Sequence, residues 1–113
     1  MVSQATESVM NTTANLLAAL IGIDSVNPSL VPGAAGEAEI ARYVRNWFGE
    51  CGVATVMYEA TAGRPSILAK VAGSGGGRSL LLCAHLDTVG VEGMAQPFVA
   101  RAPSTISCSC RSV

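Results

Sequence analysis

Residues 80–89 read LLLCAHLDTV, an uncharged apolar run that leads into the only histidine of the chain and, two residues later, an aspartate. The continuous apolar character of residues 79–85 predicts a β-strand that is buried on both faces of a sheet. Open α/β sheets place their functional sites at the carboxyl ends of such strands. His85 stands at that end. Because side chains alternate along a strand, Asp87 is expected to point to the same side as His85.

The His85–Asp87 pair suits metal binding. A carboxylate in this position can accept the second imidazole N–H, which fixes the tautomer and raises the basicity of the metal-binding nitrogen. Taken alone, the pair fits a metal ligand less well than it fits the commoner arrangement, a strand-end histidine that hydrogen-bonds a neighbouring acid. Serine-type catalysis lacks support, because the sequence contains no Gly-Xaa-Ser-Xaa-Gly elbow.

The segments before this run predict an α/β order of helix, helix, strand, strand, strand. Apolar residues recur at three- and four-residue spacing in the two predicted helices, and β-branched residues are frequent in the first predicted strand. The helices are expected at 8–23 and 37–51, with Gly52 just past the second, and the strands at 53–59, 66–72 and 79–85, with a turn at 63–65. The glycine-rich link at 73–78 precedes a strand and not a helix, so it is not interpreted as a phosphate-binding loop.

Composition excludes several functional classes. The chain has 113 residues, half of them apolar, with 13% charged residues and a net charge of -1. This balance excludes disorder over most of the chain and gives no electrostatic basis for binding nucleic acid or a membrane surface. No basic residue precedes Arg42 and no apolar run approaches the ~20 residues of a membrane span, which predicts a cytoplasmic protein. Its cysteines are expected to be free thiols, with Cys51 and Cys83 acting as small hydrophobic residues.

The sequence changes character after Phe98. Residues 101–113 are rich in serine and contain Cys108 and Cys110, without apolar periodicity. We interpret residues 1–98 as one globular portion and residues 99–113 as a divergent, disordered tail. A single-metal site built from His85, Asp87, Cys108 and Cys110 is a weaker alternative, because nothing orders the tail.

The stretch from about residue 16 to residue 98 resembles the N-terminal part of the zinc-dependent family of acetylornithine deacetylase, succinyl-diaminopimelate desuccinylase, aminoacylase and carboxypeptidase G. The matching segments are, in chain order, Ser25-Val26-Asn27-Pro28, Gly36-Glu37-Ala38-Glu39-Ile40-Ala41, Gly63-Arg64-Pro65-Ser66, Leu80 to Val89, Gly93-Met94 and Gln96-Pro97-Phe98. The resemblance implies the N-terminal part, two helices and then strands, of a zinc-exopeptidase-like three-layer α/β/α catalytic domain, which is incomplete here. It also implies that His85 is a zinc ligand and that Asp87 is the carboxylate that orients it.

Family members are metallopeptidases and deacylases whose substrates are N-acyl amino acids or small peptides. Two zinc ions hold a water that attacks the amide carbonyl, and a glutamate acts as general base. This chain departs from that pattern: no aspartate follows Asp87, and its last glutamate, Glu92, lies too close to His85 and in the wrong context to serve as the base.

Catalytic zinc normally has about three protein ligands and a water. We therefore expect the 113-residue chain to be a truncated or frameshifted family member without hydrolytic activity. The alternative is a non-catalytic interaction module that pairs an exposed sheet edge with a partner or with a second copy of the chain.

Overall fold

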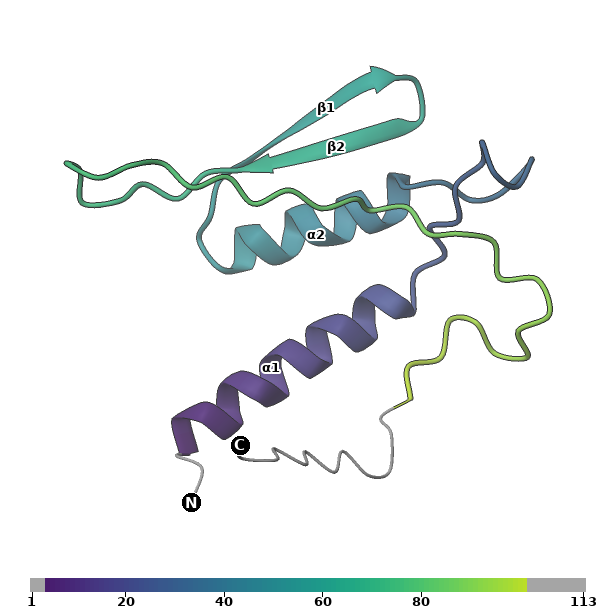
Figure 1. The fold of residues 1–113 in the computed structure, drawn as a ribbon, viewed down its shortest axis with the longest axis horizontal. Coiled ribbons are helices and arrows are strands. Elements are labelled where there is room, and N and C mark those ends of the chain that lie inside the picture. The colour runs from purple at the N-terminus through teal and green to yellow at the C-terminus, as the bar shows by residue number, and fades with distance from the viewer. Residues whose placement is uncertain (1–3, 102–113) are drawn as a thin grey trace, which may run out of the picture. The chain divides into compact units, whose positions relative to one another are not determined.

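The computed structural model describes residues 4–101, with side chains from residue 12 onward. It contains helices α1 (Gln4–Ile21) and α2 (Ala38–Glu50) and strands β1 (Thr55–Thr61) and β2 (Arg64–Ala69) (Figure 1). The described residues divide into two compact units, one of residues 4–22 with 98–101 and one of residues 23–97. The predicted mixed α/β class is confirmed at this level, and the candidate site residues all belong to the second unit.

Helix α1 begins earlier than the sequence predicts and ends two residues sooner, at Ile21. Its apolar residues lie at helical spacing but are only partly covered: Leu16 and Leu20 are half-buried, whereas Leu17 and Ile21 are exposed. Among residues 4–101, neither helix combines the length and the apolar character needed to cross a membrane.

Helix α2 matches its prediction to within one residue at each end, because Glu37 is its N-cap and Cys51 its C-cap. Ile40 and Ala41 are buried on its apolar face, and the helix packs against the hairpin formed by β1 and β2. Gly52 ends the helix as predicted: it adopts φ +73°, which favours glycine, and its neighbour Val53 donates to the carbonyl of Phe48 at 2.8 Å.

Strands β1 and β2 form an antiparallel hairpin close to the first two predicted strands. The turn consists of Ala62 and Gly63, with Gly63 at φ +76°, so it begins one residue before the predicted turn at 63–65. Arg64 and Pro65 already belong to β2. The register shifts between Tyr58 and Thr61, where two residues of β1 lie opposite Pro65. Because proline has no N–H to donate, a bulge at this point sacrifices no ladder hydrogen bond from the backbone nitrogen of Pro65.

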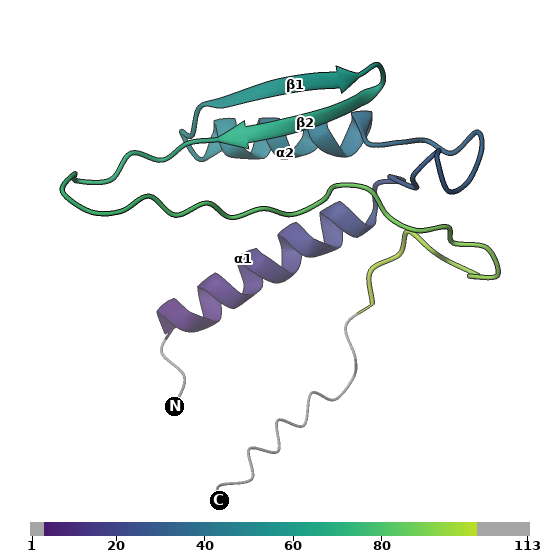
Figure 2. The same cartoon turned by 45° about the horizontal axis from the view of Figure 1, so that its top comes forward.

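The prediction of a doubly buried strand at 79–85 is wrong. The structure contains no strand there, and Leu80, Leu81 and Leu82 are 83%, 78% and 83% exposed. Figures 1 and 2 show this segment as an extended coil that returns from the glycine link toward the start of α2. A doubly buried strand needs a neighbouring strand on each side and a layer over each face, and the described residues form only a two-stranded sheet.

Few side chains of the described residues are buried, and this affects both the cysteines and the core. Cys51 and Cys83 are free thiols as predicted, but both are exposed and do not act as small buried hydrophobic residues. The buried apolar core among the described residues is small and consists of Val26, Ile40 and Ala41. The start of α2 and the loop that precedes it are therefore the best-packed part of the second unit.

Candidate functional site

The loop after α1 is shaped by Asn27. Its carbonyl accepts the N–H of Leu30 at 3.0 Å, which closes a turn with Pro28 at the second position. Its side-chain Oδ1 accepts the N–H of Ser29 at 2.7 Å. Asparagine commonly bonds the backbone two residues ahead in this way, and the bond fixes the orientation of its amide group.

Two backbone hydrogen bonds tie this loop to the end of the extended segment. The N–H of Asn27 donates to the carbonyl of Thr88 at 2.9 Å, and the N–H of Thr88 donates to the carbonyl of Ser25 at 2.9 Å. Together they form a parallel bridge between Val26 and Thr88. Val26 is buried between them, so the bridge holds the residues around His85 against the packed part of the unit.

The structure brings His85 and Asp87 together, and adds Asn27. The Nδ1 atom of His85 lies 2.7 Å from the carbonyl oxygen of Asp87 and 3.2 Å from its Oδ1. The other carboxylate oxygen, Oδ2, accepts a hydrogen bond of 2.7 Å from Nδ2 of Asn27. The imidazole is 84% exposed, whereas the Asp87 side chain is 25% exposed. The histidine ring is therefore exposed to solvent, and it lies beside a carboxylate that Asn27 holds in place.

The environment of Asp87 favours its ionised form. The hydrogen bond from Asn27 is the largest cause that lowers the pKa of Asp87 below its ordinary value of 3.8. A backbone hydrogen bond and the neighbouring His85 act in the same direction, and they outweigh the opposing effect of desolvation. Both oxygens that face Nδ1 of His85 are therefore hydrogen-bond acceptors.

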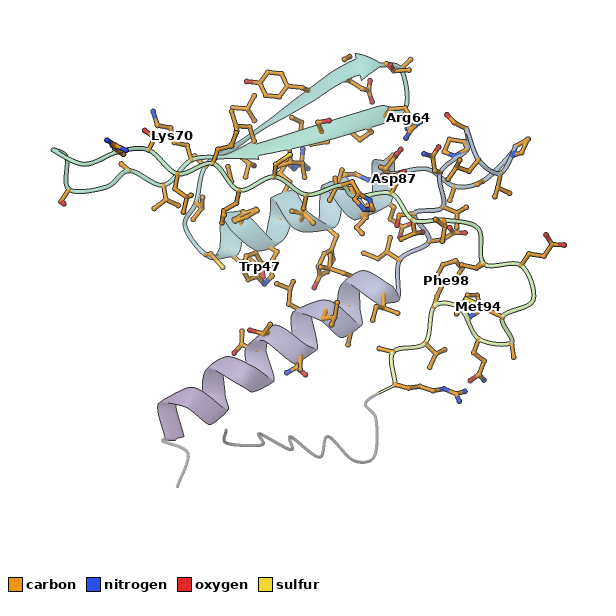
Figure 3. The ribbon with its side chains drawn as sticks, viewed as in Figure 1. Trp47, Arg64, Lys70, Asp87, Met94 and Phe98 are labelled. Carbon is orange, nitrogen blue, oxygen red and sulfur yellow. The ribbon has the colours of Figure 1, made fainter. Side chains whose placement is uncertain are left out.

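A second pair of charged residues lies beside the site. The buried carboxylate of Glu37 accepts hydrogen bonds from Nε of Arg64 at 2.8 and 2.7 Å and also pairs with its Nη2. Arg64 reaches Oγ of Ser29 at 3.2 Å through Nη1. The hydrogen bond to Glu37 raises the pKa of Arg64, and the charges of Glu37 and Asp87 add to this effect. Figure 3 shows Arg64 and Asp87 toward the same end of α2.

The described residues supply part of a metal site. Within residues 4–101, no group of three or more histidine, cysteine, aspartate or glutamate side chains is placed to hold a metal ion. His85 and Asp87 form a pair, which fits one ligand with the carboxylate that orients it. Cys108 and Cys110, which the weaker metal-site alternative requires, lie outside the described residues.

Sequence reasoning missed the roles of Asn27 and Arg64. Both occur in segments that carry the family resemblance, but no pattern in the sequence links them to Asp87 or Glu37. Asn27 and Asp87 are 60 residues apart, and Arg64 and Glu37 are 27 residues apart. The available signals, an asparagine before a proline and a glutamate at a helix start, indicate a turn and a favourable helix end. They do not identify a distant partner.

The lowered pKa of Asp87 gives a test of the Asn27 contact. Replacing Asn27 with alanine removes the main cause of the shift, so the pKa of Asp87 is expected to rise toward its ordinary value of 3.8. Because the folded-state pKa is lowered, the stabilisation from this contact is present above the ordinary pKa and is lost as pH falls through the lowered value. NMR titration of the Asp87 carboxyl carbon measures the pKa in both proteins, and an equal value in the two would contradict the contact.

Comparisons with protein-family models, curated proteins and solved structures gave no match to this chain. The features of the chain that bear on its function are therefore the sequence segments that resemble the zinc-dependent family and the geometry of Asn27, His85 and Asp87.

Proposed function

We propose that this chain forms the N-terminal portion of the catalytic domain of a zinc-dependent hydrolase that cleaves the amide bond of N-acyl amino acids or small peptides. The proposal combines the resemblance to the acetylornithine deacetylase and aminoacylase family with one structural observation. His85 follows an apolar segment, its Nδ1 faces two oxygens of Asp87, and its ring is exposed.

The contacts of Nδ1 determine which nitrogen is available. A carbonyl oxygen and an ionised carboxylate can only accept, so in the neutral ring these contacts favour the hydrogen on Nδ1 and the lone pair on Nε2. A histidine whose second nitrogen donates to a carboxylate or carbonyl is the usual arrangement of a metal ligand. His85 is thus prepared to bind a metal through Nε2.

Zinc, when bound, polarises a carbonyl and lowers the pKa of a bound water. The described residues contribute one ligand and its supporting carboxylate, whereas catalytic zinc normally has about three protein ligands. They therefore do not complete the site, and no catalytic step is assigned to them. Their proposed contribution is to orient one imidazole and hold it against the bridge between Val26 and Thr88.

The proposal predicts how zinc affects the one imidazole of the chain. In 15N-labelled protein, added zinc is expected to shift the resonance of Nε2 while Nδ1 stays protonated. The Asp87→Asn variant should bind zinc about 10–100-fold more weakly, as is typical when such a partner is lost. The readout is specific, because His85 is the only histidine and thiol binding leaves its ring unchanged. Zinc at Nδ1, or no change in the ring, would refute the proposed ligand.

A further prediction concerns the hydrolytic activity of the chain. The 113-residue chain is expected to show no hydrolysis of N-acetyl amino acids, with or without zinc, because the other ligands and the base are not among its described residues. Turnover that His85→Ala abolishes would show that the chain completes a catalytic site.

The exposed segment 79–84 favours a second candidate function, that of an interaction module that pairs with a second copy of the chain. Leu80, Leu81 and Leu82 are exposed, and the backbone of this segment makes no backbone hydrogen bond with other described residues. The segment SLLLCA carries no charge, so two copies can pair along it without charge repulsion. Unpaired extended segments of this kind are sites of strand addition and self-association.

Self-association through this segment predicts concentration-dependent oligomers in sedimentation experiments. Leu81→Lys places a charge in the pairing segment and is expected to weaken association by about tenfold or more, equivalent to about 1.4 kcal/mol. Val71→Lys is a matched control, because Val71 is similarly exposed but lies outside the segment. A monomeric wild-type protein at all concentrations, or equal effects of the two substitutions, would exclude this candidate.

A further inference from the structure

The side chain of Asn27 is held in one orientation. Its Oδ1 accepts the N–H of Ser29 at 2.7 Å, so its Nδ2 must face the other way. Its own backbone N–H is held by the carbonyl of Thr88. Both ends of the Asn27 amide group are therefore hydrogen-bonded, Oδ1 to Ser29 and Nδ2 to Asp87, and the backbone of Asn27 is itself fixed.

That contact decides how the Asp87 carboxylate lies. Nδ2 of Asn27 holds Oδ2 at 2.7 Å, which leaves Oδ1 at 3.2 Å from Nδ1 of His85. Arg64, the cation beside the site, is already bonded to Glu37 through Nε and Nη2. Asn27 thus anchors one oxygen of a carboxylate whose other oxygen faces the imidazole.

We infer that Asn27 is a positioning residue, which fixes the Asp87 carboxylate so that His85 is held as the Nδ1–H tautomer with Nε2 open. It acts through Asp87, to which its Nδ2 donates a hydrogen bond of 2.7 Å. The naming of His85 as a metal ligand rests on the proposed function, but the effect of Asn27 on the imidazole is a property of the metal-free protein. The backbone carbonyl of Asp87 also faces Nδ1, at 2.7 Å. The experiment must therefore separate the effect of this carbonyl on the tautomer from the effect of the carboxylate.

The tautomer of His85 can be read directly, because it is the only histidine. Long-range 1H–15N spectra, recorded at an alkaline pH at which the ring is neutral, distinguish Nδ1–H from Nε2–H. Nδ1–H is expected to predominate in the wild-type protein. Asn27→Asp keeps the acceptor for the Ser29 N–H but loses the donor to Asp87, and Asn27→Ala loses both.

Both variants are expected to lower the ratio of Nδ1–H to Nε2–H by about threefold or more, as for the loss of one hydrogen bond. Asp87→Asn should lower it too, while Ser29→Ala, which removes only the hydroxyl beside Arg64, should leave it unchanged. An unchanged ratio in Asn27→Asp, with the Thr88 amide signal retained as evidence of folding, would overturn the inference and assign the tautomer to the Asp87 carbonyl.

The result of the tautomer experiment is independent of the result of the zinc-binding experiment. If zinc fails to bind Nε2 while the Asn27 variants change the tautomer, the proposed ligand is wrong and the positioning role stands. If zinc binds Nε2 and the Asn27 variants leave the tautomer unchanged, the ligand stands and the positioning role is wrong.

Discussion

The parallel bridge between Val26 and Thr88 is the constraint on which the candidate site depends. It joins residues about 60 positions apart through the bonds of Asn27 N–H to Thr88 and of Thr88 N–H to Ser25. The carbonyl of Val26 also accepts the N–H of Gly36, which connects the same point to the start of α2. Closing so long a loop costs conformational entropy, which the burial of Val26 beside these bonds helps to offset.

The bridge gives the polar residues their geometry. With Thr88 fixed to the loop, Asp87 falls within reach of Asn27, and its carboxylate and carbonyl both face the imidazole of His85. Exposed side chains ordinarily sample several rotamers. Here the exposed histidine lies beside a carboxylate that Asn27, 60 residues away in the sequence, holds by a hydrogen bond of 2.7 Å.

Local patterns predicted the parts of the fold that local physics determines. The helical spacing of apolar residues placed α2 to within a residue, and Gly52 marked its end because only glycine adopts that φ at little cost. The two residues predicted as a pair do lie close together, with Oδ1 of Asp87 3.2 Å from Nδ1 of His85, although the segment is not the strand from which the alternation was argued. The partners Asn27 and Arg64 were beyond such rules, since their contacts depend on how distant segments meet.

The prediction of a buried strand at 79–85 was wrong for a related reason. An apolar run of this kind is suited to the centre of a sheet. The described residues form only a two-stranded sheet, which does not provide that environment. Three exposed leucines are the result. The two proposed functions account for this surface differently. A hydrolase domain would cover it with further strands of its own sheet, and an interaction module would cover it with a second copy.

Amide hydrogen exchange, followed residue by residue, tests the bridge most directly. The amides of Asn27 and Thr88 are expected to exchange at least about tenfold more slowly than those of Leu81 and Leu82, because, within the described part of the chain, only the first two donate backbone hydrogen bonds. Exchange of Asn27 and Thr88 as fast as that of the leucines would show that the bridge does not hold, and that the geometry of His85 and Asp87 has no fixed support.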